Sequence, residues 1–317
     1  MAKYQSIYGE IQDRARIPWS FVTIFAVILV GIIASFAVAA IFIGIGFATG
    51  GLADVSELRE FVKTQTFVSG PLELALPTAM VILCAVFWVR IIENRSFASM
   101  GFSKHGWLAR YLGGFVVGAL FLLTILGIIY AAGGYTVVSI FPVAASTAPV
   151  FPALILAAYL IGFLVQGASE EVVFRGWWMS ALAARRGKAI ALVVTSIFFG
   201  LAHMGNVNPP TMESMIGVAN VMLFGLFIGL YALKEGSIWG VCGWHSAWNW
   251  LLGLGFGLEV SGQGIDATPL LVDLADAEGA STFLTGGGFG PEASFVTTAV
   301  LLAGCGWFVM RGALRKE

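Results

Sequence analysis

The sequence predicts an all-α polytopic membrane bundle of about eight transmembrane helices, with both termini in the cytoplasm. Hydrophobic residues make up 58% of the chain and charged residues only 11%, against roughly 25% charged in a typical soluble domain. A soluble protein of 317 residues would need more than 17 basic and 18 acidic residues to form a charged surface. The other two observations are apolar runs of membrane-spanning length and an alternating distribution of Lys and Arg.

Each expected helix is a run of about 20 apolar residues, which crosses ~30 Å of hydrocarbon at ~1.5 Å per residue. Clusters of Gly and Pro separate the runs, as at Gly50–Gly51 and Gly133–Gly134. The first run exceeds the roughly 7–15 residue core of a secretory signal, so we expect it to be retained as a helix. The eight expected spans are roughly 17–47, 71–90, 110–132, 150–184, 189–206, 214–233, 237–258 and 294–312.

The basic residues test this number of spans independently, because cytoplasmic connections collect Lys and Arg. With the N-terminus inside, Arg175 lies within a helix and only Arg59 and Lys63 lie outside. The expected cytoplasmic segments hold all the other basic residues, namely Lys3, Arg14, Arg16, Arg90, Arg95, Lys104, Arg110, Arg185, Arg186, Lys188, Lys234, Arg311, Arg315 and Lys316. An error of one span would disrupt this alternation, so the pattern supports eight helices.

We expect a single membrane domain over residues 1–317, with a catalytic core at about 150–258. A Gly-rich outer loop at about 259–293 follows it and is expected to cover the outer mouth of the bundle. This loop has no Lys or Arg and contains the acidic residues Asp266, Asp273, Asp276 and Glu278. Small residues spaced four apart favour close helix packing in lipid, and the chain has two such pairs, Gly114 with Gly118 and Gly225 with Gly229.

Net charge and cysteine placement exclude other classes of protein. The net charge is −1 and no long basic tract exists, so we expect no nucleic-acid partner. Cys84, Cys242 and Cys305 lie in apolar runs without a close Cys neighbour. That placement indicates packing rather than a zinc or redox motif.

Polar residues at membrane depth mark the candidate site, because a charged side chain there costs at least ~2.5–3.5 kcal/mol on insertion scales. Glu170, His203 and Asn249 each lie 15 residues from a basic residue at the expected cytoplasmic surface, or ~22 Å at ~1.5 Å per residue. Three expected helices therefore place polar groups in one layer. The residues concerned are Glu170, Glu171 and Arg175, then His203, then His245 and Asn249.

Spacing within the first of these helices separates its two glutamates. Glu171 and Arg175 are four residues apart and face each other, so we expect a structural ion pair that neutralises both in low dielectric. Glu170 points about 100° away from Glu171 on a helix of ~3.6 residues per turn. Its carboxylate is therefore expected to be free for chemistry.

A free carboxylate, a histidine on a neighbouring helix and a His/Asn pair suit hydrolysis without a covalent nucleophile. Glu170, helped by His203, is expected to take a proton from water. His245 and Asn249, four apart on one face, are expected to donate hydrogen bonds to the oxyanion on the attacked carbonyl. Phe199 precedes His203 by four residues, so its ring is expected to pack beneath the imidazole in a supporting role.

These motifs together resemble the CPBP family of intramembrane proteases. The matching residues span about 80 positions, Glu170-Glu171-x-x-x-Arg175, Phe199-x-x-x-His203 and His245-x-x-x-Asn249, with no departure at a signature position. The family comprises the CAAX prenyl endopeptidases of the Ras-converting type and the bacterial bacteriocin-processing or Abi-type proteins. The resemblance implies peptide hydrolysis within the membrane, with Glu170 activating water, His203 as its partner, and His245 and Asn249 as oxyanion-stabilising groups.

The resemblance leaves the metal question open, since the family has been described both as a metalloprotease and as a metal-independent glutamate protease. We expect no cofactor. The alternative is zinc, bound by Glu170, His203 and His245 with water as the fourth ligand.

The function expected is an endopeptidase acting on a membrane-bound peptide or lipoprotein substrate, in the lipid bilayer of a prokaryotic inner (plasma) membrane. A proton- or ion-coupled transporter is the leading rival, because Glu, His and Arg inside a bundle also build proton relays. A non-catalytic membrane chaperone or immunity protein is the second rival.

Overall fold

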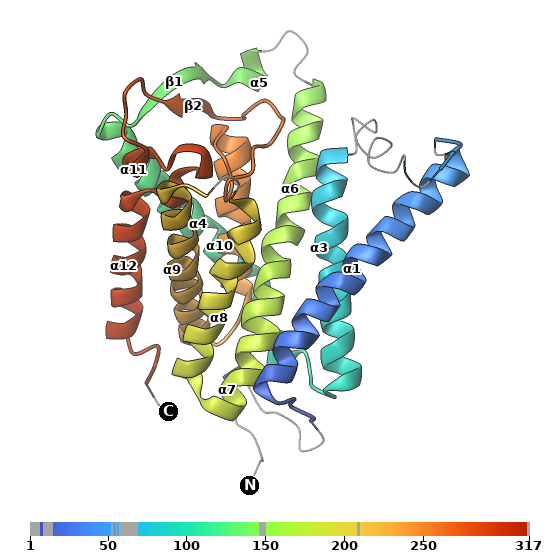
Figure 1. Ribbon diagram of the computed structural model, residues 1–317. Coiled ribbons are helices and arrows are strands. Elements are labelled where there is room, and N and C mark those ends of the chain that lie inside the picture. The colour runs from blue at the N-terminus through green and yellow to red at the C-terminus, as the bar shows by residue number, and fades with distance from the viewer. Residues whose placement is uncertain are drawn as a thin grey trace.

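The structure is a computed structural model that describes residues 7–8, 15–51, 53–54, 56, 69–145, 150–207 and 210–315. Its helices run side by side in one bundle (Figure 1), and six of the described helices are long and apolar enough to cross a membrane. The predicted all-α polytopic membrane bundle is thereby confirmed. The chain is a multi-pass membrane protein.

The long helices agree closely with the expected spans, and two short strands lie outside those spans. The first half of the chain contains α1 (Ser20–Thr49), α3 (Ser69–Phe87), α4 (Trp107–Ala131), β1 (Tyr135–Ile140) and α5 (Pro142–Ala145). The second half contains α6 (Val150–Glu171), α7 (Ser180–Arg186), α8 (Lys188–Ala202), α9 (Met212–Glu235), α10 (Trp239–Trp250), β2 (Val272–Asp276), α11 (Thr282–Thr285) and α12 (Phe295–Met310).

Short π and 3-10 segments extend or join these helices. The π-helical segments are Trp88–Ile92 after α3, Val172–Met179 between α6 and α7, and Leu251–Gly255 after α10. The 3-10 turns are Ala98–Met100, His203–Asn206, Gly287–Phe289 and Pro291–Ala293. Helix α10 with its π segment fills the seventh expected span, and α12, with 16 residues, fills the eighth.

Local sequence signals explain where the site helices begin and end. Helix α9 starts at a capping box in which Thr211 and Ser214 satisfy each other's backbone N–H groups. It ends at Gly236, which adopts a left-handed φ of 66°. Lys234 is the basic residue 15 positions before Asn249 from which the depth of Asn249 was estimated. Because the two residues lie on different helices, that estimate was wrong in assuming one unbroken helix.

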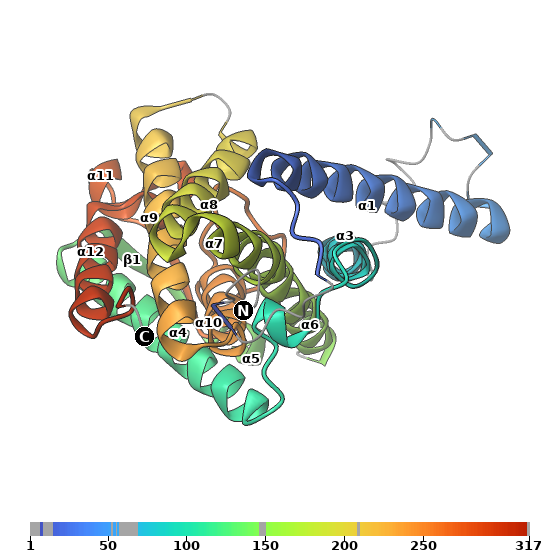
Figure 2. The same ribbon diagram turned by 90° about the horizontal axis from the view of Figure 1, so that it is seen from below.

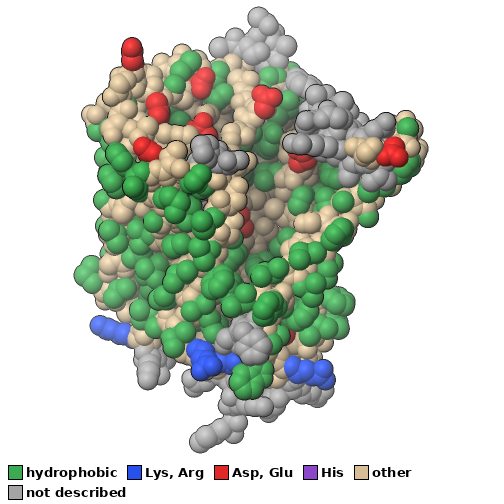
Figure 3. Space-filling view, viewed as in Figure 1, with side chains coloured by type: hydrophobic (Ala, Val, Ile, Leu, Met, Phe, Trp, Pro, Cys, Tyr) green, Lys and Arg blue, Asp and Glu red, His purple; other side chains and the backbone are tan. Residues whose placement is uncertain are grey.

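The two ends of the bundle carry opposite charge. Figure 3 shows the Lys and Arg side chains of this face at one end and Asp and Glu at the other. At the basic end, Arg185 donates a hydrogen bond to the backbone oxygen of Ile17. Lys234 Nζ donates to the backbone oxygen of Arg311 at 2.9 Å. Cytoplasmic placement of this end stays a prediction. Of the basic residues used for it, Lys3, Arg14, Arg59, Lys63 and Lys316 lie outside the described residues.

The loop expected at 259–293 contains regular structure that the sequence did not predict. Strand β2 pairs antiparallel with β1, from Tyr135 opposite Asp276 to Ile140 opposite Val272. The two strands, together with α5 and α11, lie at the acidic end (Figure 1). The pairing escaped prediction because its partners lie more than a hundred residues apart, and the apolar spans dominate the sequence pattern.

Close contact between helices occurs at the predicted small residues. A Cβ atom at Gly114 would meet the backbone of Gly240, and one at Gly118 would meet the backbone of Trp244, so α4 and α10 pack closely through glycine. Gly225 and Gly229 of α9 likewise face α8, against Ser196 and Leu192. Figure 2 shows α10 among α4, α6 and α9, whereas α1 extends away from the bundle. Helix α10 is therefore held at the centre, where its polar residues meet those of α6.

Adjacent glycines of α4 give a test of this packing. We expect Gly114→Ala to lower the free energy of unfolding by about 1–3 kcal/mol, because the added methyl group must displace the α10 backbone. A Cβ atom at Gly113 would have no neighbouring heavy atom within 4 Å. Gly113→Ala should therefore raise the free energy of unfolding by about 0.5–1 kcal/mol through helix propensity alone. Thermal unfolding in detergent measures both variants. Equal shifts for the two would contradict close α4–α10 contact.

Candidate active site

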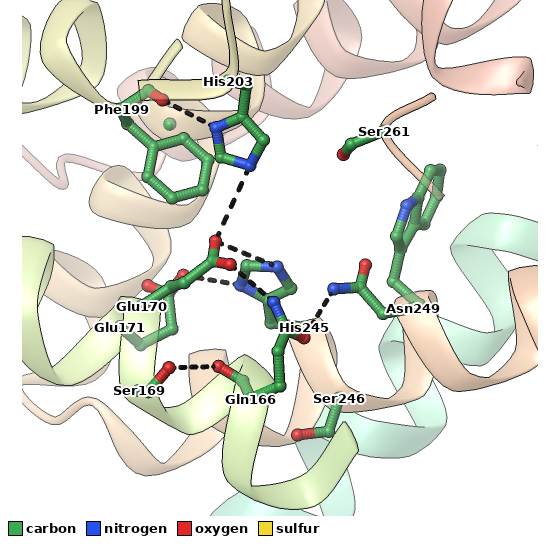
Figure 4. A network of polar contacts seen from close by, with 12 residues as sticks. Gln166, Ser169, Glu170, Glu171, Phe199, His203, His245, Ser246, Asn249 and Ser261 are labelled. Atoms are coloured by element: carbon green, nitrogen blue, oxygen red, sulfur yellow. Dashed lines mark hydrogen bonds and ion pairs between the residues drawn. The ribbon is translucent and has the colours of Figure 1, made fainter. Parts of the chain in front are cut away.

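The site forms where α6, α8 and α10 approach one another near the middle of the bundle. Helix α6 ends at Glu171 and continues as the π-helical segment Val172–Met179, and π turns are frequent at functional sites. His203 follows the last residue of α8, whereas His245 and Asn249 lie within α10. Figure 4 shows the side chains of these helices directed toward one another.

The carboxylate of Glu171 is shared by two partners. Arg175 Nη1 donates to Oε1 of Glu171 at 3.1 Å, and both side chains are buried, with exposed fractions of 1% and 0%. His245 Nδ1 lies 2.8 Å from the same oxygen. Because a carboxylate can only accept, Nδ1 of His245 carries the proton and Nε2 is directed to the site. Sequence spacing predicted the ion pair but not this bond to His245.

Arg175 joins three helices around this carboxylate. Its Nη2 donates to the backbone oxygen of Gly225 on α9 at 3.2 Å. Its guanidinium lies over the ring of Phe199 on α8, 4.3 Å from the centroid. A cation over an aromatic face is stabilised by about 0.5–2 kcal/mol. The ion pair is therefore part of a cluster that fixes α6, α8 and α9 relative to one another.

Glu170 presents one carboxylate oxygen to both imidazoles. Gln166 Nε2 donates to Oε1 of Glu170 at 2.5 Å. Oε2 lies 3.9 Å from His203 Nε2 and 3.7 Å from His245 Nε2 (Figure 4). Neither separation is a direct hydrogen bond, and Oε2 is buried without a hydrogen-bond partner among the described residues.

His203 is oriented by the backbone of its own helix. Its Nδ1 lies 2.8 Å from the carbonyl oxygen of Phe199. A carbonyl can only accept, so Nδ1 is protonated and Nε2 faces Glu170. The ring of Phe199 packs against this imidazole with centroids 4.9 Å apart, in the place expected for it.

Gln166 is a site residue that the sequence analysis missed. Its Oε1 accepts a hydrogen bond from Asn249 Nδ2 at 2.8 Å, while its amide group donates to Glu170. One side chain thus connects the carboxylate of α6 to the Asn of α10. A search restricted to ionisable residues overlooks an amide, although Gln166 precedes Glu170 by four residues and so shares its helix face.

The loop between α10 and α12 approaches the site from the acidic end. Glu292 accepts hydrogen bonds from Trp248 Nε1 at 3.0 Å and from the backbone and hydroxyl groups of Ser261. Asn206, just beyond His203, donates to the backbone oxygen of Ser261 at 3.0 Å. Burial raises the pKa of Glu292, against the opposing effects of Trp248, Ser261 and nearby His203. The sequence offered no signal for this contact, because Glu292 lies in a loop that is 44 residues along the chain from Trp248.

The three side chains considered for zinc lie close to one another, at separations slightly longer than those between zinc ligands. Ligands at ~2.0–2.2 Å from a tetrahedral zinc lie about 3.4 Å apart, whereas Oε2 of Glu170 is 3.7 and 3.9 Å from the two Nε2 atoms. Over the part of the chain that the structure describes, no group of three or more His, Cys, Asp or Glu side chains is placed to hold a metal ion. The absence of a cofactor stays a prediction, and zinc stays its alternative.

Comparison with known families agrees with the resemblance carried by the motifs. Residues 152–251, about a third of the chain, match the family model described as Type II CAAX prenyl endopeptidase Rce1-like. The matched segment contains the Glu170, His203, His245 and Asn249 positions, and the expected resemblance to CAAX-type proteases is confirmed over it. No significant match was found among curated proteins or among solved structures.

The buried ion pair gives a test of the cluster. We expect Arg175→Gln to lower the free energy of unfolding by about 3–5 kcal/mol, because it leaves the Glu171 carboxylate buried without its cation. The pair of Arg110 with Glu235 is a matched control, since Arg110 is 37% exposed, and Arg110→Gln should cost about 1 kcal/mol or less. Thermal unfolding compares the two. Similar decreases in the free energy of unfolding for the two variants would contradict the burial of the Glu171–Arg175 pair away from solvent.

Proposed function

We propose that this protein is an intramembrane endopeptidase that hydrolyses a peptide bond of a membrane-associated or lipid-modified substrate, using water activated by Glu170 without a metal ion. The supporting observation is the Oε2 atom of Glu170, which is buried, lacks a hydrogen-bond partner among the described residues and lies within 4 Å of two imidazoles. Buried polar atoms are nearly always hydrogen-bonded. Oε2 is therefore the acceptor for the attacking water.

Charge balance at the site suits an ionised Glu170. Arg175 compensates Glu171, so these two residues leave no net charge beside the site. An ionised Glu170 needs one further positive charge in this low-dielectric surrounding. A protonated His245, with Nδ1 donating to Glu171 and Nε2 directed at Glu170, supplies it.

The reaction follows from the hydrogen-bond directions. Glu170 takes a proton from water as the water oxygen bonds to the carbonyl carbon, and the carbonyl oxygen becomes an oxyanion. His245 donates from Nε2 and Asn249 donates from its amide group, and both stabilise that oxyanion. Collapse of the intermediate breaks the C–N bond, and the proton held by Glu170 passes to the departing amine. His203 stays oriented by Phe199 and directs its Nε2 to the same carboxylate oxygen.

The family match supports the reaction class. Residues 152–251 match a family of prenyl endopeptidases, and they include the four residues given roles here. Residence in a prokaryotic plasma membrane is part of the proposal.

Replacement of the proposed base gives the direct test. We expect Glu170→Gln to reduce cleavage of a membrane peptide library by at least about 100-fold, because the amide cannot accept the water proton. Glu278→Gln, in the exposed acidic loop, is the matched control and should retain wild-type cleavage. Product formation by purified protein in detergent, followed by mass spectrometry, measures the rates.

The same assay separates the alternatives. Cleavage that persists with a strong chelator supports the metal-free proposal, whereas cleavage lost with chelator and restored by zinc contradicts it. Ion or proton transport in liposomes without cleavage of any peptide would favour the transporter.

A further inference from the structure

A groove runs between α8 and α12 in the half of the bundle that carries the basic end. Both helices pack against α9, which lies between them in Figures 1 and 2. Glycines allow both contacts, because a Cβ atom at Gly229 of α9 would meet Leu192 of α8 and one at Gly304 of α12 would meet Phe227 of α9. The two outer helices leave between them an open space of about 540 Å³.

Apolar side chains line the groove. Its floor contains the buried residues Leu192, Leu230 and Cys305, one from each of the three helices. Its sides include exposed residues such as Val193 of α8 and Val309 of α12. The volume falls within the range of about 300–1,000 Å³ that is usual for ligand sites. An apolar groove of this size on a membrane-spanning bundle suits a hydrocarbon chain.

The length of the groove matches one leaflet of a bilayer. On α12 the lining residues extend from Leu302 to Met310, which is ~12 Å at ~1.5 Å per residue. Half of the hydrocarbon core is ~15 Å thick. Gly306 lies midway along this stretch, and a Cβ atom there would have no heavy atom within 4 Å. The missing side chain of Gly306 therefore helps to keep the groove open.

Basic residues from all three helices stand at the basic end of the groove. Lys188 begins α8 and directly precedes the lining residue Ala189. Lys234 lies in the last turn of α9, and Arg311 directly follows the lining residue Met310 of α12. Lys234 Nζ donates to the backbone oxygen of Arg311 at 2.9 Å, so the ends of α9 and α12 meet here. The groove thus ends at a cluster of cations.

The charges of this cluster are available to an anion. The partner of Lys234 is a neutral carbonyl oxygen, and the neighbouring Glu235 lies 3.5 Å from Arg110 of α4. The Arg311 guanidinium lies over the ring of Trp307, 5.5 Å from the centroid. Trp307 is half-exposed, and exposed tryptophans are typical of the level of the lipid headgroups. An anion bound here would lie at headgroup depth.

We infer that the groove is a binding site for an anionic phospholipid, with an acyl chain between α8 and α12 and the phosphate group among Lys188, Lys234 and Arg311. Basic pockets between transmembrane helices recognise anionic headgroups through such charges. The site is separate from the candidate active site, because His203 lies at the opposite end of α8 from Lys188. The inference does not depend on the proposed endopeptidase function.

Charge also argues against a second copy of the chain as the occupant. In a two-fold symmetric pair the same surface meets itself, so two sets of Lys188, Lys234 and Arg311 would approach each other in the same leaflet. Like charges brought together across an interface oppose association. A phospholipid supplies the apolar chain that the groove fits and the negative charge that its end lacks.

Native mass spectrometry of the purified full-length protein in detergent tests the headgroup contacts. The protein is titrated with phosphatidylglycerol and with phosphatidylcholine carrying the same acyl chains. We expect phosphatidylglycerol to bind at least about ten times more tightly, and Lys188→Gln or Arg311→Gln to weaken it about fivefold each, since a basic residue near the membrane surface contributes about 1 kcal/mol. Lys104→Gln removes an exposed charge from the loop before α4, and as the matched control it should change neither affinity.

A second pair of variants tests the groove itself. Gly306→Phe places a ring in the groove and should weaken phosphatidylglycerol binding at least about tenfold, because the acyl chain loses its apolar contact surface. Gly127→Phe on α4 is the matched control, since a Cβ atom there also has no heavy atom within 4 Å, and it should bind lipid like the wild type. Thermal unfolding in detergent checks that both variants are folded.

Three results would overturn the inference. The first is equal affinity for the two lipids, and the second is an equal effect of Lys188→Gln, Arg311→Gln and Lys104→Gln. The third is lipid binding by Gly306→Phe that matches that of Gly127→Phe. If Gly306→Phe instead dissociates a dimer and leaves lipid binding unchanged, the groove is an interface between two copies of the chain and the phospholipid site is excluded.

Discussion

The site depends on one buried carboxylate. Glu171 contributes no proton transfer in the proposed reaction, yet its Oε1 holds both the guanidinium of Arg175 and Nδ1 of His245. A charge removed from water at this depth is tolerated only when it is paired and hydrogen-bonded. The hydrogen bond from His245 to the Glu171 carboxylate therefore requires α6 and α10 to meet at a set distance. The same bond turns Nε2 of His245 toward Glu170. The orientation of the reactive groups follows from the need to neutralise a neighbour.

The second constraint is the close packing that lets α10 reach the centre. Gly114 and Gly118 bring α4 onto the α10 backbone, and Gly225 brings α9 against α8 beside Arg175. In lipid, helices associate through such contacts and through polar groups rather than through exclusion of water. The glycines set the helix separations at which hydrogen bonds such as Arg175 to Gly225 can form. Packing and polar chemistry are thus two parts of one arrangement.

Much of the fold was predictable because span length and charge distribution are local properties. Six expected spans correspond to long apolar helices, and the Glu171–Arg175 pair follows from spacing on one helix. The structure also places Glu170, His203 and His245 together, while their catalytic roles remain proposals. Contacts between distant segments were not predictable from spacing. They include the bond from His245 to Glu171, the bridge through Gln166, the β1–β2 pairing and the contact of Glu292 with Ser261.

The most direct measurement of the central claim is the protonation of the His245 imidazole. The chain has three histidines, so ¹⁵N NMR of imidazole-labelled protein, assigned with His105→Gln and His203→Gln variants, resolves both nitrogens of His245. Anchoring by Glu171 predicts a proton on Nδ1 at every pH at which the protein is folded, with only Nε2 titrating. A neutral His245 that carries its proton on Nε2 and leaves Nδ1 bare would contradict the account.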